Sequence, residues 1–381
     1  MAENGRRLNA STPVLDGSSS VDVALLMPNF GGGGAERMMA RLARALSERG
    51  RRIEMVVCTA DGPFTQHCGP DVSVVELGRR SVLASLPALV RYLRRTRPKV
   101  LMVTLDHMSV MAIFARWIAG VDMRLVIRQA NNPLAYRGGT VRDRLVVHLL
   151  RSLLKHADAI ATGSQGVACD LIRWARLPSV KVHVVGNPVV DDSLAGLAQE
   201  DVNHPFFAPG APPVILGAGR LTPQKDFHTL LRAFVVARRM RPLRLIILGE
   251  GPDRTSLEAF VEDQGLAADV RLPGFVENPF AYMRRSQVFV LSSAWEGLPG
   301  VLVQAMACGC PVVSTDCRSG PSEILAGGRF GPLVPVGDAD ALGAAIVATV
   351  STPIEAAELR EAISAYSVER SVTRYEAVLW P

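Results

Sequence analysis

The sequence predicts an α/β protein with two doubly wound parallel-sheet domains in tandem. Three observations predict this class. The length of 381 residues fits two domains of about 100–200 residues each. Short apolar runs alternate with segments of helical periodicity, which is typical of βαβ units. The alternation stops near Asn187-Pro188, in a stretch rich in polar residues and proline, and resumes near Pro213.

The first domain is expected to begin with a buried strand at Val21–Met27, a glycine-rich turn and a helix over Ala35–Arg49. A second helix is predicted over Leu83–Arg95, because its apolar residues recur on one side. The further strands expected in this domain are Arg52–Cys58, Val74–Leu77, Val100–Leu105, Leu125–Ile127 and Ala159–Thr162.

The second domain repeats the pattern, with helices predicted near residues 226–240 and 299–308. Its expected strands are Val214–Gly217, Leu243–Leu248, Val270–Leu272, Val288–Leu291 and Pro311–Ser314. We divide the chain into a polar tail (1–20), a first domain (21–190), a linker (191–212), a second domain (213–350) and C-terminal helices (351–381) expected to return to the first domain. In such folds, ligands bind at the carboxyl ends of the strands, here between the two domains.

Composition and charge exclude several classes of protein. The apolar content excludes a disordered chain, and no run of about 18 uncharged apolar residues predicts a membrane span. Residues 1–20 lack the apolar core of a signal peptide. Residues 1–190 contain 26 Lys and Arg but only 14 Asp and Glu, so the net charge of +6 conceals a first half at +12 and a second half at −6. A basic half implies a polyanionic partner, which is nucleic acid, anionic lipid or a phosphorylated substrate.

The six cysteines predict neither a metal site nor disulfides. They form no Cys-x-x-Cys pair, and Cys308-Gly-Cys310 alone lacks the ligand spacing of a zinc site. We expect reduced, buried thiols, as in a cytoplasmic protein.

The glycine-rich turn at Gly31–Gly34 opens a helix with the run Gly-Gly-Gly-Gly-Ala-Glu-Arg. Glycine lets the backbone approach a ligand, and the free N–H groups of a helix N-terminus suit a phosphate. The run matches neither G-x-G-x-x-G nor a Walker loop, because Glu36 stands at the sixth position and no Gly-Lys-Ser/Thr follows. A phosphate contact and an ordinary strand-to-helix turn both remain open.

Two cations follow the first strand of the second domain, in Gly219-Arg-Leu-Thr-Pro-Gln-Lys225. A diphosphate leaving group gains charge as its bond to carbon breaks. A guanidinium and an ammonium at Arg220 and Lys225 would stabilise that charge without a metal. The alternative interpretation is a pair of solvated surface cations.

A third motif, Glu296-Gly-Leu-Pro-Gly-Val-Leu-Val-Gln304, also lies between a strand and a helix. Gly297 and Gly300 leave backbone N–H groups accessible, and the Glu296 carboxylate suits sugar hydroxyls. Alternatively, Glu296 caps the helix that follows. Gln304 is expected in the first turns of that helix, facing the space between the domains.

Together these motifs resemble the family 4 retaining glycosyltransferases, which have the GT-B fold of two facing Rossmann-like domains. The resemblance extends over about residues 21–350 and is particularly close to bacterial enzymes that extend polysaccharides or lipid-linked glycans. The other motifs that carry it are the Gly-Gly-Ala-Glu-Arg run, Asn187-Pro188, Ala305-Met-Ala-Cys-Gly-Cys-Pro-Val-Val313 and Ser319-Gly-Pro-Ser-Glu323.

The resemblance implies four catalytic residues. Arg220 and Lys225 would bind the donor diphosphate, and Glu296, the first glutamate of the family's Glu–seven residues–Glu motif, would contact the donor sugar. His107 falls near the family's donor-sugar histidine, although a structural histidine is the alternative. The implied donor-binding residues are Gly32, Gly33, Gly34, Gly219, Val276, Gly297, Leu298, Pro299, Gly300 and Gln304.

One of these positions departs from the family pattern. The second glutamate of the motif, which holds the ribose hydroxyls, is Gln304 here. Glutamine offers a carbonyl acceptor and an amide donor but not a charge, which would weaken or alter nucleotide binding.

Two other patterns are interpreted as structural. Asp338-Ala-Asp340 has the form of a metal-binding D-x-D, but it precedes an apolar helix, Ala341–Val350, that Asp340 would cap. His148 and His156 are expected to be surface or packing residues.

The basic segments Leu83–Lys99 and Arg137–Lys155 combine cations with apolar residues. Such faces suit an anionic membrane, at about 1 kcal/mol per cation. Alternatively, their apolar residues pack on the sheet. Nucleic acid is not expected, because aromatic residues are only 6% and none alternates with basic residues.

The sequence thus predicts a hexosyltransferase-type glycosyltransferase that needs no metal or other cofactor. It would move a sugar from a nucleotide diphosphate, most simply a UDP-sugar, to a hydroxyl of a lipid-linked or polysaccharide acceptor in bacterial surface glycan biosynthesis, with retention. It would be cytoplasmic and peripheral on the inner face of the plasma membrane. The alternatives are a catalytically weak GT-B-like binding subunit of a glycosyltransferase complex and a sugar-nucleotide epimerase, which the Glu296 motif disfavours.

Overall fold

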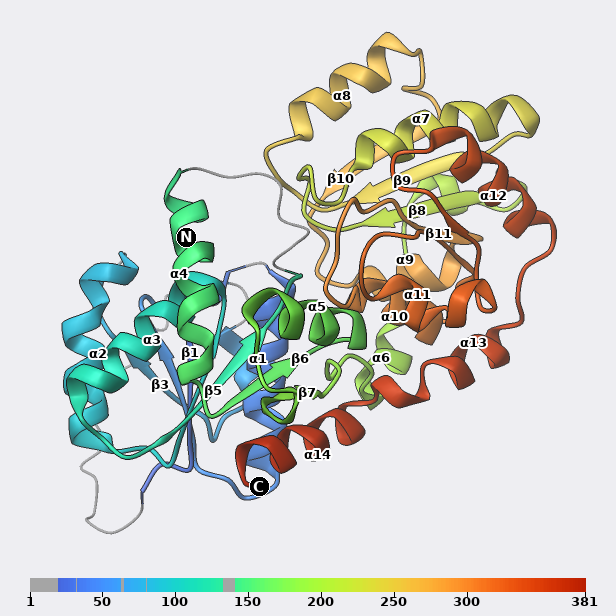
Figure 1. Ribbon diagram of the computed structural model, residues 1–381. Coiled ribbons are helices and arrows are strands. Elements are labelled where there is room, and N and C mark those ends of the chain that lie inside the picture. The colour runs from blue at the N-terminus through green and yellow to red at the C-terminus, as the bar shows by residue number, and fades with distance from the viewer. Residues whose placement is uncertain (1–19, 32, 63–64, 80, 133–140) are drawn as a thin grey trace, which may run out of the picture.

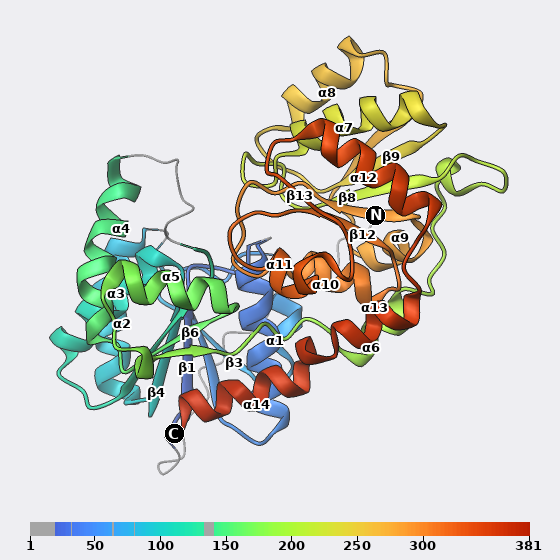
Figure 2. The same ribbon diagram turned by 45° about the vertical axis from the view of Figure 1, so that its right-hand side comes forward.

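The chain forms two lobes, each with a parallel sheet between helices (Figures 1 and 2). The computed structural model describes residues 20–31, 33–62, 65–79, 81–132 and 141–381. The polar tail up to residue 19 and Gly32 therefore lie outside the described residues.

Within the described residues, the first sheet has seven parallel strands in the order β3-β2-β1-β4-β5-β6-β7. Its strands are β1 (Val23–Met27), β2 (Ile53–Val57), β3 (Ser73–Glu76), β4 (Val100–Thr104), β5 (Arg124–Gln129), β6 (Ala159–Thr162) and β7 (Val182–Val184). The helices of this lobe are α1 (Gly34–Glu48), α2 (Val82–Thr96), α3 (Asp106–Ala119), α4 (Val141–Leu153) and α5 (Gln165–Ala175).

The second sheet has six parallel strands in the described part of the chain, in the order β10-β9-β8-β11-β12-β13. Its strands are β8 (Val214–Ala218), β9 (Arg244–Leu248), β10 (Val270–Gly274), β11 (Val288–Leu291), β12 (Val312–Thr315) and β13 (Leu333–Val334). The helices that follow β7 are α6 (Asp192–Leu197), α7 (Phe227–Met240), α8 (Arg254–Asp263), α9 (Pro279–Arg285), α10 (Gly300–Ala307), α11 (Pro321–Ile324), α12 (Ala339–Ser351), α13 (Ala356–Ala362) and α14 (Val368–Leu379).

Burial on both faces explains the apolar strands. All five residues of β1 are buried, and so are those of β4 and β8. One core of the first lobe lies under α1 and α14, and another lies under α2 and α3. Helices cover both faces of a parallel sheet in this way because each crossover returns over one face. The predicted class, with two doubly wound α/β domains, is confirmed.

Some elements were not predicted from the sequence. Helix α3 was not predicted because buried residues lie on most of its sides, which leaves no polar stripe to reveal the helical period. The segment expected to be a linker contains a helix, α6. The prediction that Asp340 caps the apolar helix was wrong: helix α12 begins at Ala339, and the carboxylate of Asp338 accepts the N–H of Ala341 at 2.9 Å.

The C-terminal helices divide between the two lobes. Helix α13 packs on the core of the second lobe through Leu359, whereas α14 packs on the first lobe through Val372 and Tyr375. The chain crosses between the lobes twice, and the two crossings lie side by side, because Val368 donates its N–H to the carbonyl of Val190 at 2.9 Å.

Candidate functional site

The motifs meet where the strand order of each sheet reverses. In the second sheet this point lies between β8 and β11: Arg220 follows β8, and the loop with Glu296 follows β11. In the first sheet it lies between β1 and β4, which are followed by the glycine turn and by Asp106-His107. Adjacent strands send their connections to opposite faces at such a point, which leaves a crevice for a ligand.

An ion pair lies at the reversal point of the second sheet. The ammonium of Lys225 lies 2.5 Å from Oε1 of Glu296, and the hydroxyl of Ser293 donates to the same oxygen at 2.7 Å. Glu296 is only 5% exposed. The interpretation of Glu296 as a helix cap was wrong, because Pro299 occupies the N-cap of α10. The ammonium is therefore held in place before any ligand arrives.

Arg220 lies against the glycine turn of the other lobe. A Cβ atom added to Gly33 would lie 3.2 Å from Nη2 of Arg220 and 2.2 Å from Oε2 of Glu36. A side chain at position 33 would therefore require the ends of Glu36 and Arg220 to move. The turn from β1 to α1, which includes Gly34 as its first helical residue, and the guanidinium thus face the same space.

The loop of residues 296–300 is packed on the first lobe. A Cβ atom on Gly297 would lie 2.1 Å from the carbonyl oxygen of Ala130, so only glycine fits there. The hydroxyl of Ser164 donates to the carbonyl of Gly297 at 2.9 Å. Leu298 and Pro299 are buried, and Gly300 begins α10. The conformation of this loop therefore depends on the contact between the lobes.

The remaining predicted site residues differ in burial and in the lobe to which they belong. Gln304 lies one turn into α10 and is 9% exposed. Gly219 directly follows β8, and a Cβ added to it would lie 3.2 Å from Cε of Lys225. Val276 is half-buried after β10. His107 is exposed at the start of α3, on the first lobe, whereas Arg220, Lys225 and Glu296 all belong to the second lobe.

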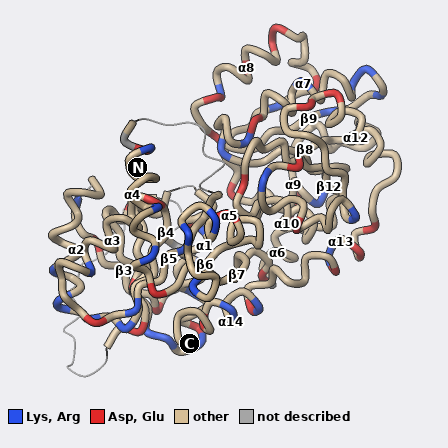
Figure 3. Tube along the Cα trace, viewed as in Figure 1, with Lys and Arg blue, Asp and Glu red and all other residues tan. Residues whose placement is uncertain are grey.

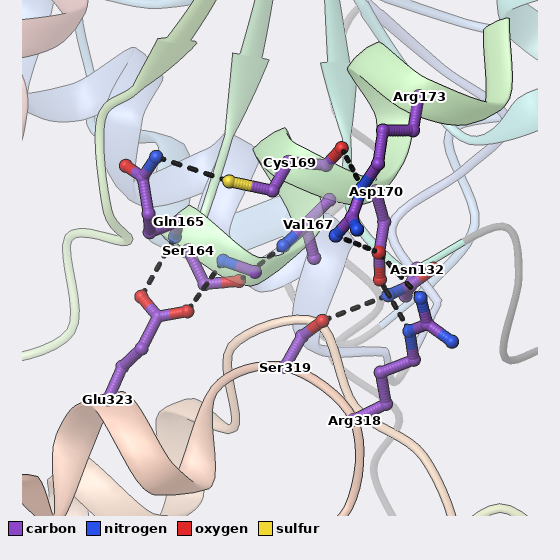
Figure 4. A network of polar contacts seen from close by, with 11 residues as sticks. Asn132, Ser164, Gln165, Val167, Cys169, Asp170, Arg173, Arg318, Ser319 and Glu323 are labelled. Atoms are coloured by element: carbon purple, nitrogen blue, oxygen red, sulfur yellow. Dashed lines mark hydrogen bonds and ion pairs between the residues drawn. The ribbon is translucent and has the colours of Figure 1, made fainter.

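A network of polar contacts joins the lobes beside this loop (Figure 4). We call it the clasp and define it as Asn132, Gln165, Gly166, Asp170, Arg318, Ser319 and Glu323. Nε and Nη2 of Arg318 donate to the two carboxylate oxygens of Asp170, each at 2.6 Å. The carboxylate of Glu323 accepts the N–H groups of Gln165 and Gly166 at 2.8 and 2.7 Å, at the N-terminus of α5.

The stability that the clasp contributes depends on pH, because two of its residues, Asp170 and Glu323, carry carboxylates. Hydrogen bonds from Arg318 hold the pKa of Asp170 below its ordinary value of 3.8, although burial opposes them. A carboxylate whose pKa is lowered in the folded protein stabilises the folded form at neutral pH. This stabilisation is lost as the pH falls through the lowered pKa.

We predict that Glu323→Ala loosens the start of α5. Two N–H groups would lose a charged acceptor, and hydrogen bonds to charged groups contribute about 1.5–3 kcal/mol. Amide hydrogen exchange in a peptide spanning residues 163–170 should become about 10- to 100-fold faster. Glu361→Ala, on an exposed position of α13, is the control and should leave that exchange unchanged. Unchanged exchange in Glu323→Ala would show that the carboxylate does not hold the lobes together.

Sequence reasoning missed the clasp residues as functional candidates. Ser319 and Glu323 were noticed only as the two ends of a motif. Ser164, which lies beside the clasp, has a local signal, since its side chain accepts the N–H of Val167 as the N-cap of α5. Asp170 and Arg318 have no local signal, because they lie 148 positions apart. The two expected surface or packing histidines are both exposed, and the ring of His156 packs edge-on against Trp117 with centroids 5.0 Å apart.

Five of the six cysteines are buried, and Cys169 is half-buried. Burial raises the pKa of Cys308 to about 12. Such a thiol stays protonated at neutral pH and is a poor nucleophile or metal ligand.

Two family models match the chain, one in each lobe. The model described as "Glycosyl transferase 4-like domain" matches residues 33–188. The model described as "Glycosyl transferases group 1" matches residues 212–352.

Among similar proteins of known name, one from Campylobacter jejuni is the N-acetylgalactosamine-N,N'-diacetylbacillosaminyl-diphospho-undecaprenol 4-alpha-N-acetylgalactosaminyltransferase. It is 32% identical over 237 residues, which are 61% of this chain and 62% of that protein. An uncharacterised glycosyltransferase of Methanocaldococcus jannaschii is 31% identical over 54% of this chain and 51% of its own length. The matched region thus covers less than two thirds of both relatives. The lipopolysaccharide core biosynthesis glycosyltransferase LpsE of Rhizobium meliloti is 27% identical over 82% of this chain and 84% of its own.

Solved structures share the fold. The apo form of the lipopolysaccharide outer core galactosyltransferase WaaB superposes with a TM-score of 0.72, at 18% identity, over 94% of this chain and 99% of its own. Anabaena HepE in complex with UDP and glucose superposes with a TM-score of 0.73, at 21% identity, over 93% of this chain and 97% of its own. At this identity the likeness shows the two-domain architecture alone.

Proposed function

Because the chain belongs to the family 4 glycosyltransferases with the GT-B fold, we propose that it transfers a sugar from a UDP-sugar to a hydroxyl of a lipid-linked or polysaccharide acceptor, with retention, in bacterial surface glycan biosynthesis. The names of its relatives support this pathway, since they act in lipopolysaccharide core synthesis or on a diphospho-undecaprenol glycan. The solved complex of a protein of the same fold with UDP and glucose supports the donor class.

One observation carries the proposal: the ion pair of half-buried Lys225 with buried Glu296, in the same loop region as exposed Arg220, at the reversal point of the second sheet. The Lys225 ammonium and the Arg220 guanidinium bind the donor diphosphate. As the bond between the anomeric carbon and the phosphate oxygen breaks, the charge gained by the phosphate is stabilised by these cations. The two cations take the role that a divalent metal has in other enzymes, so the proposed enzyme is metal-independent.

In the proposed reaction, Glu296 orients both Lys225 and the donor sugar. The acceptor hydroxyl attacks the anomeric carbon on the face from which the phosphate departs, and its proton passes to the departing phosphate oxygen. The configuration is retained, and no side chain forms a covalent bond to the sugar. The backbone of the 296–300 loop and the Gly33–Gly34 turn approach the sugar and the phosphates from opposite lobes.

Calorimetry and a donor-hydrolysis screen test this function. We expect UDP to bind and one UDP-sugar to be hydrolysed slowly without an acceptor, with GDP and GDP-sugars as the comparison. The alternative, a catalytically weak binding subunit, is motivated by Gln304, which lacks the charge for ribose contact. The absence of nucleotide binding at millimolar concentration would favour that alternative over the enzyme.

We also propose that the enzyme is cytoplasmic and docks on an anionic membrane. None of the helices in the described residues is long and apolar enough to cross a membrane. Exposed apolar side chains instead gather on two neighbouring helices, and we call them the α3–α4 patch. Its members are Phe114, Trp117, Ile118, Val141, Leu145 and Leu149. Phe114 and Trp117 pack edge-to-face at 5.5 Å, and exposed Arg144 and Arg151 lie on the same helix as Leu145.

The two basic segments, Leu83–Lys99 and Arg137–Lys155, differ in how they would contribute to membrane binding. On α2, Leu89 and Leu93 are buried in the core, so the apolar face packs on the lobe and the arginines lie in solvent. On α4, Leu150 is buried but Leu145 is 57% exposed. The segment 137–140 lies outside the described residues. Lysines and arginines are frequent along the first lobe (Figure 3), which favours anionic lipid as the partner.

We predict that Trp117→Glu and Leu145→Glu each remove the protein from anionic liposomes in a flotation assay. A carboxylate placed in the patch is repelled by anionic lipid and is costly to bury. Met240→Glu, which alters an equally exposed side chain on the second lobe, is the control and should float like the wild type. The patch is not the docking site if both variants also float normally.

A further inference from the structure

One strand end at the reversal points carries a carboxylate, that of Asp106, to which no role has been assigned so far. Four strand ends surround these points, and three of them carry donor-binding elements: the turn after β1, Arg220 after β8 and the 296–300 loop after β11. The fourth is the end of β4, where Asp106 begins α3 and precedes His107, the histidine expected near the donor sugar. A ligand in the crevice would meet the ends of β1 and β4 together, because these strands pair directly.

The backbone is strained immediately before Asp106. Leu105 has φ 74° and ψ 140°, a conformation that a leucine rarely adopts and that costs about 1–3 kcal/mol. Two hydrogen bonds hold it, since the N–H and the hydroxyl of Ser109 both donate to the carbonyl of Leu105 at 2.9 Å. Strain that the surroundings maintain in this way is concentrated at functional sites.

A neighbouring amide fixes one oxygen of the Asp106 carboxylate. Nε2 of Gln129, which is 3% exposed, donates to Oδ1 of Asp106 at 3.0 Å and to the carbonyl of Asn131 at 3.1 Å. Both hydrogens of the amide are thus used. Among the described residues, no donor contacts the other carboxylate oxygen, Oδ2. The fold therefore holds the Asp106 carboxylate in a fixed orientation in which Oδ2 can accept a further hydrogen bond.

Asp106 is connected to the donor loop through the chain that holds it. Gln129 is followed by Ala130 and Asn131, whose backbone packs against Gly297: an added Cβ there would lie 2.1 Å from the Ala130 carbonyl and 3.2 Å from Cα of Asn131. The loop proposed to bind the donor sugar thus rests on the segment that orients Asp106. Burial also raises the pKa of Asp106, so the fold retains a carboxylate where its charge is disfavoured.

We propose that Asp106 binds the acceptor: its carboxylate accepts a hydrogen bond from a hydroxyl of the acceptor sugar and fixes that sugar at the first lobe, facing the donor. The proposal rests on the proposed transferase function. The carboxylate of Asp106 can accept several hydrogen bonds, and the hydroxyl groups of the acceptor sugar can donate them. Asp106 takes no proton in the net reaction, since the proton of the attacking hydroxyl leaves with the phosphate.

The experiment separates transfer to a sugar from transfer to water. UDP release and glycoside product are measured for Asp106→Asn with the UDP-sugar that the wild type hydrolyses, with and without a panel of p-nitrophenyl glycosides as acceptor probes. We expect unchanged donor hydrolysis, an unchanged donor KM and unchanged UDP binding. The kcat/KM for the glycoside should fall about 10- to 100-fold, as expected when a hydrogen bond to a charged group is lost.

Controls distinguish this role from a structural one. Asp122→Asn alters an exposed carboxylate that precedes β5. It lies at the amino ends of the strands, away from the carboxyl ends that form the site, and should leave every rate unchanged. If Asp106 only stabilised the first turn of α3, Asp106→Asn would lower the melting temperature and leave the acceptor KM unaltered. That result would overturn the proposal, and so would a parallel loss of donor hydrolysis. If the wild-type protein itself hydrolysed no UDP-sugar, the result would instead contradict the transferase function.

Discussion

Lys225→Ala is expected to lower sugar transfer by about 10²- to 10³-fold. The ammonium of Lys225 is held 2.5 Å from Glu296 at the reversal point of the second sheet, where the departing phosphate of the donor is proposed to lie. Removing one preorganised group that stabilises developing charge raises a reaction barrier by about 2.7–4 kcal/mol. The loss should fall mainly on kcat, since the charge is greatest in the transition state. Initial rates with varied donor measure it.

The same substitution has a cost in stability that must be separated from its effect on catalysis. It leaves Glu296, which is 5% exposed, without its cation, and breaking a buried pair costs at most about 3–5 kcal/mol, with less expected here because Lys225 is only half-buried. Thermal melting therefore accompanies the kinetics, and Lys225→Arg, which keeps the charge, should recover part of both losses. Lys99→Ala removes an exposed ion pair with Asp22 far from the site and should change neither quantity. A folded Lys225→Ala variant with near-normal turnover would refute the assignment.

Glu296→Ala is the second substitution with a large expected effect, about 10²-fold or more on transfer. The carboxylate positions Lys225 and is proposed to contact the donor sugar, so its removal acts on both the cation and the substrate. Glu296→Gln should lie between the alanine variant and the wild type, because the amide oxygen still accepts from Ser293 but no longer holds the ammonium by charge.

The experiment on Glu296 measures how far each substitution changes the donor KM and how far it changes kcat. A loss confined to KM would mean that Glu296 only binds the donor, and a loss in kcat supports its role in orienting Lys225. Glu258→Ala removes the carboxylate of a surface ion pair on α8 and is the matched control. Equal activity of Glu296→Ala and the wild type would leave the Glu296 motif without a catalytic role.

The sequence alone predicted the fold class correctly, and it singled out the residues from which the proposed site is built. Strands and helices alternate, and the apolar strands are continuous because parallel sheets are buried on both faces. Arg220, Lys225 and Glu296 stood out because they lie between a strand and a helix, in segments that also contain glycine. These signals are local: strand, turn and helix follow one another within about ten residues.

Tertiary structure decided what depends on distant residues. It paired Lys225 with Glu296, joined Asp170 to Arg318 across 148 positions, and placed Ala130 under Gly297 so that only glycine fits there. It also assigned α13 and α14 to different lobes and oriented Asp106 through Gln129. The physical reason is that periodicity and turn composition reflect neighbours along the chain, whereas contacts between lobes arise only when separate sheets pack and bring their strand ends together.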